Sequence, residues 1–363
     1  MRFKKGLSKI SPYKPGKPIE EVKRALGLAE VYKLASNEIP FAPRYIRKAV
    51  LRELENINRY PESSCFYLRK VIAQKLGISG EQIVFGNGSD EIITLVVRAF
   101  IERGDEVIVA YPTFLIYELQ AKVEGARVVR VPLRDFRYDL EAMAEKITGK
   151  TKIIFIANPD NPTGTYVNQR EIAEFLKRVP KNILVYLDEA YFEFAPEDFP
   201  KSLDILKKKS NIIVTRTFSK VYGLAGLRIG YGITTKDIAN VLNRIREPFN
   251  INRFSQVSAL AALENKLFLK KTLSYIGKEK EYLYAELKRL GLFFIESATN
   301  FILVDFKNNT KALYEYLLKR GVIIREMGSW GFKNFFRVTV GTSRENKKFV
   351  KNLENFLNKG RKA

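Results

Sequence analysis

The sequence predicts an α/β protein with a largely parallel sheet and a second, smaller α+β domain. Short apolar runs without polar alternation recur, and a helix-like stretch separates each from the next, at residues 83–85, 107–110, 153–157, 183–187, 212–214 and 228–233. Such runs indicate strands that are buried on both faces, as in parallel sheets. The pattern then changes after about residue 250, where a long helical region (255–290) precedes two strands at 301–306 and 335–340, with a helix between them and another at the end. This change predicts the second domain.

We therefore expect three parts. Residues 1–35, rich in Pro and Gly, form an arm that packs with the small domain. Residues 36–250 form the large domain, and residues 251–363 form the small C-terminal one. In an open sheet of this kind, ligands gather beyond the carboxyl ends of the strands, so the residues that follow each apolar run are the candidates for a functional site.

Composition excludes several kinds of chemistry. The chain has no histidine and a single cysteine, Cys65. A Ser-His-Asp triad, a Cys-His pair and a histidine-ligated zinc site are therefore excluded, and we expect no metal. The single cysteine fits a reducing compartment. With no apolar run long enough to span a bilayer and no signal peptide, the sequence predicts a soluble cytoplasmic protein with no membrane partner.

The formal net charge of +23 raises nucleic acid as a partner. The basic residues are spread along the chain, however, and no zinc-finger spacing or aromatic-basic RNA motif accompanies them. A charged surface is the better interpretation, and we expect no nucleic acid to bind. A nucleic-acid-binding protein remains the rival from another class, and it would show salt-sensitive binding.

The segment GNGSDE (86–91) follows a strand and opens a helix. Backbone N–H groups and the helix dipole at Gly88, Ser89 and Asp90 would hold a phosphate. Ser89 and Asp90 could equally be ordinary helix caps. The segment is not a dinucleotide-binding fingerprint, because the third glycine is missing.

Other strand ends carry candidates with two interpretations each. Asp188 is either a helix cap or the partner of a protonated ring nitrogen, since a carboxylate at the mouth of a buried strand needs a cationic or hydrogen-bonding partner. Asn161, in NPTG, is a functional amide or part of a turn. Tyr111 could be a core residue. Lys220, in TFSKVYGLAGLRIGY (217–231), is a surface lysine or a desolvated Schiff-base nucleophile, and Arg228 could neutralise a phosphate close by.

These motifs, taken in order, resemble those of the fold-type I pyridoxal-phosphate (PLP) aminotransferases over nearly the whole chain. The family has a mainly parallel seven-stranded sheet in its large domain. Within it, the sequence is similar to the histidinol-phosphate aminotransferase branch, to which the N-terminal SPYKPGK points. The segments that carry the resemblance are SPYKPGKPIEEVKRALGL (11–28), KLASNE (33–38), RYPE (59–62), GNGSDE, NPDNPTG (158–164), DEAYFEF (188–194), TFSKVYGLAGLRIGY and FRVTVGT (336–342).

The resemblance implies the following cofactor site. Lys220 would bond covalently to PLP and move the proton, and Asp188 would pair with the pyridine nitrogen. Tyr191 and Asn161 would bond the phenolic oxygen of the ring, and Tyr111 would stack on its face. The phosphate would be held by Gly88, Ser89, Asp90, Thr217, Ser219 and Arg228. Tyr60, in RYPE, would reach that phosphate from the other subunit of a homodimer.

The resemblance also implies the substrates. Arg337 would grip the substrate carboxylate with its planar fork, with Asn161 beside it. Arg325 would hold the phosphate of histidinol phosphate, with Tyr13 nearby. The expected reaction is transamination between L-histidinol phosphate and 2-oxoglutarate, a step of histidine biosynthesis.

One loop departs from the family pattern. Residues 39–43 are Ile-Pro-Phe-Ala-Pro, where the family usually has Asn-Pro-x-Gly-Pro. Ile39 and Phe41 would also suit an apolar or aromatic substrate side chain. An aromatic amino acid aminotransferase of broader specificity is therefore the main alternative, and a decarboxylase of a phosphorylated amino acid is a more distant one.

Overall fold

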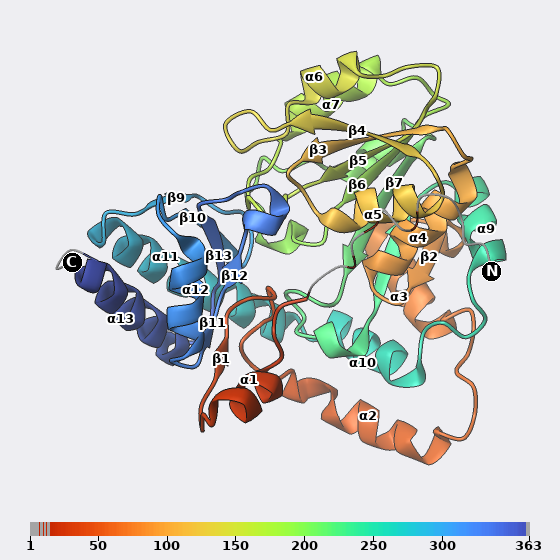
Figure 1. Ribbon diagram of the computed structural model, residues 1–363. Coiled ribbons are helices and arrows are strands. Elements are labelled where there is room, and N and C mark those ends of the chain that lie inside the picture. Colours follow the sequence, from red (N-terminus) through yellow and green to blue (C-terminus); the bar gives the residue numbers. More distant parts are fainter. Residues whose placement is uncertain (1–6, 8–9, 11, 13–14, 361–363) are drawn as a thin grey trace.

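A seven-stranded sheet forms the larger part of the computed structural model, which describes residues 7, 10, 12 and 15–360 (Figure 1). The strand order is β2-β8-β7-β6-β5-β3-β4, and β8 is antiparallel to both of its neighbours while the remaining pairs are parallel. The strands are β2 (Ile83–Gly86), β3 (Glu106–Tyr111), β4 (Arg127–Pro132), β5 (Thr151–Ala157), β6 (Leu184–Asp188), β7 (Ile212–Thr217) and β8 (Gly230–Ile233). The prediction of a mainly parallel sheet is confirmed.

Six of these strands coincide with the predicted apolar runs, and the seventh, β4, was missed. In β2, β6, β7 and β8 every residue is buried, so hydrophobic pattern and burial agree. The edge strand β4 instead exposes Arg127, Arg130 and Pro132. An edge strand with one open side needs no continuous apolar run, and the run-based prediction could not detect it.

Helices cover both faces of this sheet. Figure 1 shows α6 (Leu140–Glu145) and α7 (Gln169–Arg178) on one side, with α4 (Ser89–Phe100) and α5 (Leu115–Val123) on the other. The same unit contains α3 (Phe66–Leu76), α8 (Ser202–Leu206) and α9 (Lys236–Ile245). Apolar residues of the strands and helices form one large buried cluster.

A second sheet has four antiparallel strands in the order β12-β13-β10-β9. Its strands are β9 (Phe293–Ile295), β10 (Phe301–Asp305), β12 (Arg325–Glu326) and β13 (Phe335–Thr339), and the helices around it are α11 (Lys266–Arg289), α12 (Thr310–Leu318) and α13 (Ser343–Gly360). A separate core lies between this sheet and these helices. The helix α10 (Arg253–Glu264) packs instead with the larger core, through Ala259, Ala262 and Leu263, although it follows residue 250.

The described part of the N-terminal arm packs with the smaller unit. After α1 (Ile19–Leu26), the short strand β1 (Tyr32–Lys33) pairs in parallel with β11 (Val322–Ile323). Leu34 is buried in the smaller core. The chain then crosses to α2 (Arg47–Glu53), beside the larger unit (Figure 1). Within the described residues, every helix is too short or too polar to cross a membrane.

Candidate active site

A cavity of about 290 Å³ lies where the carboxyl ends of the large-sheet strands face the smaller sheet. Residues from both units line it, and most of the predicted site residues are among them. Those that line it are Gly88, Ser89, Asp90, Asn161, Asp188, Tyr191, Thr217, Ser219, Lys220, Arg228, Arg325 and Arg337. The fold therefore brings together residues that are up to about 250 positions apart in the chain, as the strand-end argument predicts.

One end of the cavity is the N-terminus of α4. The N-cap is Gly88, with φ 76°, and no side chain caps the helix, so Ser89 and Asp90 are first-turn residues rather than caps. The Arg228 guanidinium lies directly against Gly88, because a Cβ added to this glycine would be 2.6 Å from Arg228 Nη2. Arg228 Nη2 also donates to Asp90 Oδ2 at 3.3 Å. First-turn N–H groups beside a guanidinium form a site for an anion.

The approach of β8 to α4 makes this arrangement possible. A Cβ on Gly230 would lie 2.7 Å from the backbone nitrogen of Ser89, so a larger residue could not sit there. The neighbouring strand β7 ends at Thr217, whose hydroxyl accepts a hydrogen bond from the backbone N–H of Ser219 at 3.1 Å. Thr217 ends β7 and Ser219 follows it, so this one strand end brings two hydroxyl groups to the cavity that the start of α4 also lines.

Asp188 is at the end of β6 and only 5% exposed. Tyr117 donates to its Oδ2 at 2.6 Å, and the backbone N–H of Ala190 donates to Oδ1 at 3.1 Å. Burial raises the pKa of this carboxyl to about 6, and these two donors and the nearby Lys220 only partly offset that effect. A carboxylate whose pKa is raised by burial is stabilised by a cationic partner, and the cavity has room for one beside Asp188.

Lys220 also lines the cavity, near enough to Asp188 to lower the pKa of that carboxyl. Its Nζ is 5.2 Å from the ring centroid of Tyr191. The Tyr191 hydroxyl accepts a hydrogen bond from Asn37 Nδ2 at 2.8 Å. Asn37 has a φ of 56°, and its backbone N–H donates to Thr339 Oγ1 at 2.9 Å, which ties this amide to the smaller sheet.

Arg337, on β13, reaches across from the smaller sheet to the larger unit. Its Nη1 donates to Asn161 Oδ1, and its Nη2 donates to the carbonyl of Ala35 at 3.0 Å. Arg337 as a whole is 4% exposed. Its planar fork is therefore held by an amide of the large unit and by the arm, and Arg337 lines the cavity from the smaller sheet.

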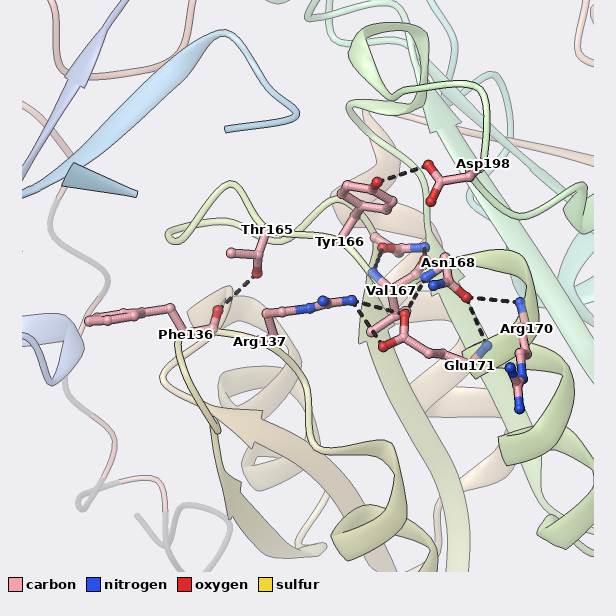
Figure 2. A network of polar contacts seen from close by, with 10 residues as sticks. Phe136, Arg137, Thr165, Tyr166, Val167, Asn168, Arg170, Glu171 and Asp198 are labelled. Carbon is pink, nitrogen blue, oxygen red and sulfur yellow. Dashed lines mark hydrogen bonds and ion pairs between the residues drawn. The ribbon is translucent and has the colours of Figure 1, made fainter. Parts of the chain in front are cut away.

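The loop that carries Asn161 is fixed on both sides. Inside, the carboxylate of Asp160 accepts hydrogen bonds from the hydroxyls of Thr113 and Thr163 at 2.7 and 2.8 Å. On the outer side, Figure 2 shows the hydroxyl of Thr165 donating to the carbonyl of Phe136 at 2.8 Å. These bonds hold Asn161 in position within the cavity wall.

Two predicted residues in the described part of the chain, Tyr111 and Tyr60, do not line the cavity. Tyr111 ends β3, but its ring packs under the guanidinium of Arg130 at 4.5 Å, and Phe114 lines the cavity instead. Stacking of Tyr111 on the cofactor ring therefore stays a sequence prediction, and the lining of the cavity does not support it. Tyr60 is 78% exposed and lies outside the cavity of its own chain. Tyr13 lies outside the described residues.

Sequence reasoning missed some of the lining residues. They are Pro15, Gly16, Ala35, Ser36, Asn37, Phe114, Ile116, Tyr117, Ala157, Pro159, Ala190 and Trp330. Asn37 stands in the quoted motif KLASNE, and Phe114 and Tyr117 follow the apolar run at 107–110, so the strand-end rule could have included them. No local pattern marks Trp330. Ile39 and Phe41 do not line the cavity, and Phe41 packs edge-on against Phe268 and Tyr275.

Comparisons with known proteins agree with this geometry. The family model for class I and II aminotransferases matches residues 29–353. The chain belongs to this family and is therefore an aminotransferase. A relative named histidinol-phosphate aminotransferase, from Moorella thermoacetica, is 45% identical over 98% of this chain and 93% of its own length. Another with the same name, from Anoxybacillus flavithermus, is 42% identical over 99% of this chain and 98% of its own length.

Solved structures give the same picture. The histidinol-phosphate aminotransferase of Sinorhizobium meliloti, crystallised in complex with pyridoxal-5'-phosphate, matches with a TM-score of 0.92 at 28% identity and covers 99% of this chain and 98% of its own. The histidinol-phosphate aminotransferase of Clostridium acetobutylicum matches with a TM-score of 0.84 at 28% identity, covering 91% of this chain and 100% of its own.

Proposed function

We propose that this aminotransferase uses pyridoxal 5'-phosphate to transfer an amino group between L-histidinol phosphate and 2-oxoglutarate, giving imidazole-acetol phosphate and glutamate. The observation that carries the proposal is the arrangement of one cavity. An uncapped helix N-terminus with Arg228 lies at one end, Asp188 and Lys220 lie between, and Arg325 and Arg337 face them from the smaller sheet. The relatives named above, at 42 to 45% identity over nearly the full length, support this choice of substrate.

The residues present fit the cofactor. Because Gly88 has no Cβ, the Arg228 guanidinium can lie directly against the N-terminus of α4, where an anion is favoured. We propose that the phosphate is held there by Gly88, Ser89, Asp90, Thr217, Ser219 and Arg228. The buried carboxylate of Asp188 would pair with the protonated pyridine nitrogen, and Asn161 and Tyr191 would bond the ring oxygen. We assign the contact with the ring face to Phe114.

The chemistry divides between the cofactor and the chain. When bound, the cofactor supplies an electron sink for the negative charge that develops at the substrate Cα. The Lys220 amine, released by the incoming substrate amine, would move a proton from the substrate Cα to C4′ of the cofactor in the first half-reaction and from C4′ to Cα in the second. Asp188 would keep the ring nitrogen protonated, because its buried carboxylate lowers its free energy by pairing with a cation.

The two arginines would bind the acidic groups of the substrates. Arg337 has its planar fork oriented by Asn161 and Ala35, and it would take the α-carboxylate of glutamate in a two-pronged contact. Arg325 would take the phosphate of histidinol phosphate. That Tyr13 lies near this phosphate stays a sequence prediction.

A homodimer is part of the proposal. Several large apolar side chains near Tyr60 in the sequence are exposed, namely Leu51, Leu54, Ile57, Phe66 and Tyr67, and the exposed ring of Phe249 stacks on that of Tyr60 at 4.7 Å. Exposed apolar side chains of this kind support contact with a second copy of the chain. Twofold pairing would let Tyr60 of each chain reach the phosphate site of the other. Light scattering at micromolar concentration should give twice the monomer mass.

The deciding measurement is the visible absorption spectrum of the purified protein with its cofactor. A yellow band that bleaches with histidinol phosphate, and hardly with phenylalanine, is the expected result. Equal bleaching by phenylalanine would favour the broader aromatic enzyme, although the two residues that suggested it, Ile39 and Phe41, lie outside the cavity. Lys220→Ala should abolish the adduct that borohydride traps, and a normal adduct at another lysine would contradict the assignment.

The cysteine content of the chain bears on the compartment in which the enzyme works. One cysteine, Cys65, is buried and free, which suits a reducing compartment. We propose that the enzyme works in the cytoplasm on small-molecule substrates.

A further inference from the structure

Two arginines face each other across neighbouring strands at the cavity. Arg325 on β12 and Arg337 on β13 are direct partners in the antiparallel register. Side chains of such partners leave the same face of a sheet with their Cβ atoms about 5 Å apart, and two like charges in this position destabilise the pair. Both guanidinium groups line the cavity. The two guanidinium groups therefore repel each other at a place where a bound anion would offset the repulsion.

One indole ring lies close to both arginines. The Cζ atom of Arg325 is 5.9 Å from the centroid of the Trp330 ring, and the Cζ atom of Arg337 is 5.7 Å from it. The Cζ atom of Arg337 is also 5.0 Å from the centroid of the Phe301 ring. A guanidinium within about 6 Å of an aromatic face is attracted by it, most strongly by indole. Since the two indole distances are near that limit, each contact is a modest one.

The position of this indole is fixed by its surroundings. Trp330 is 1% exposed and packs with Ile295, Leu303 and Met327 of the smaller unit. Its ring also lies 6.5 Å from that of Phe114, at the start of α5 in the larger unit. The indole is therefore packed between the two units, and it cannot follow either arginine if that side chain moves.

The loop that carries Trp330 is also closely fitted. The backbone N–H groups of Trp330 and Phe332 both donate to the carbonyl of Met327, at 3.0 and 3.1 Å. Gly331 follows with a φ of 102°, and a Cβ there would be 2.8 Å from Pro112 Cγ and 3.0 Å from the hydroxyl of Tyr111. The turn thus docks against the end of β3, so that the large sheet sets the position of the ring.

We propose that Trp330 is a positioning residue for the arginine pair. Its ring holds Arg325 and Arg337 on one aromatic surface, so that the acidic groups of a substrate meet two guanidinium groups at a set separation. This inference rests on the proposed function for the identity of the substrates. The competing interpretation is that Trp330 only fills the core between the two units.

Kinetics of three variants separate these interpretations. Trp330→Leu keeps an apolar side chain but removes the aromatic face, and it should raise KM for glutamate and for histidinol phosphate about three- to tenfold, the range of one or two modest cation–π contacts. Its kcat should stay within about twofold, since the proton-transfer groups are untouched. Trp330→Phe should restore most of the affinity. Phe332→Leu is the matched control, because Phe332 packs beside Phe136 and Phe335, and its KM should be unchanged.

A second readout does not depend on turnover. Trp330 is the single tryptophan of the chain, so the intrinsic emission reports on this ring alone. Glutarate, a dicarboxylate with no group to transfer, should change the emission of the cofactor-free protein in a saturable way. The same titration of Arg325→Gln should need several times more glutarate.

The outcomes are distinct. A Trp330→Leu enzyme with the KM of the wild type, or a glutarate titration without a saturable change, overturns the positioning role. If Trp330→Leu does not fold, Trp330→Phe and the titration still decide. Failure of histidinol phosphate to bleach the wild-type holoenzyme would instead refute the proposed function, and the glutarate titration would still test the role of Trp330.

Discussion

Glu189 and Arg216 form a buried ion pair directly behind the candidate active site. Arg216 Nε and Nη2 both lie 2.9 Å from Glu189 Oε2, and the two side chains are 1 and 10% exposed. Glu189 follows Asp188 on β6, and Arg216 precedes Thr217 on β7, so the pair joins two strands that end at the cavity. The guanidinium also lies over the ring of Phe192, at 3.7 Å.

We predict that Glu189→Gln strongly destabilises the protein. At a separation of about 3 Å and an effective dielectric constant of about 20, the attraction is on the order of 5–6 kcal/mol. Part of it offsets desolvation, and removing one partner of such a pair costs about 3–5 kcal/mol, because the other charge stays buried. With an m-value of about 3 kcal/mol/M, the urea midpoint of the cofactor-free protein should fall by about 1 M or more.

Glu193 provides the matched control. Burial raises the pKa of this carboxyl to about 8, despite the nearby Arg216, so most of it is protonated at pH 7. Glu193→Gln therefore removes little charge, and we expect it to shift the stability by less than about 1 kcal/mol. If Glu189→Gln shifts the urea midpoint no more than Glu193→Gln does, the ion pair is not the dominant contact and the reasoning is refuted.

Three further predictions concern the cavity. Arg337→Lys should raise KM for glutamate at least about tenfold in steady-state kinetics, because an ammonium cannot reproduce the planar fork, and an unchanged KM would exclude the carboxylate role. Burial raises the pKa of Asp188 to about 6, above its ordinary value near 4, so the folded state binds more protons between these pH values and stability falls as pH rises through them. Asn carries no titrating group, so the free energy of unfolding of Asp188→Asn, measured relative to wild type, should increase by up to about 3 kcal/mol from pH 4 to pH 8. Urea unfolding of the cofactor-free proteins at each pH measures this difference. A difference that does not change with pH would argue against a titrating carboxyl at this position. Of Phe114 and Tyr111, only Phe114 lines the cavity, so Phe114→Leu should weaken PLP retention several-fold in a dialysis assay, while Tyr111→Leu should retain PLP nearly as well as wild type. If Tyr111→Leu instead loses PLP more readily than Phe114→Leu does, Tyr111 contacts the cofactor.

The parts of the fold that were predictable are those whose burial is continuous along the chain. Every residue of β6 and of β7 is buried, and the apolar runs found them. The strand β4 was missed because its exposed arginines interrupt the run, and this omission had a consequence in the site. Arg130 of β4 covers the ring of Tyr111, so without β4 nothing in the sequence indicated that Tyr111 has a partner outside the cavity.

The two ends of the cavity differ in how much the sequence determines them. In the anion site, one helix start supplies Gly88, Ser89 and Asp90, and the strand-end rule finds these residues as well as Thr217 and Ser219 at the end of β7. The arginine pair depends instead on β12, a strand of only two residues, and on its register with β13. No hydrophobic pattern fixes the register of so short a strand. The spacing of Arg325, Trp330 and Arg337 along the chain therefore does not reveal that one ring contacts both guanidinium groups. Where acidic groups of a substrate are recognised by side chains brought together through long-range pairing, the three-dimensional structure is needed to find the residue that positions them.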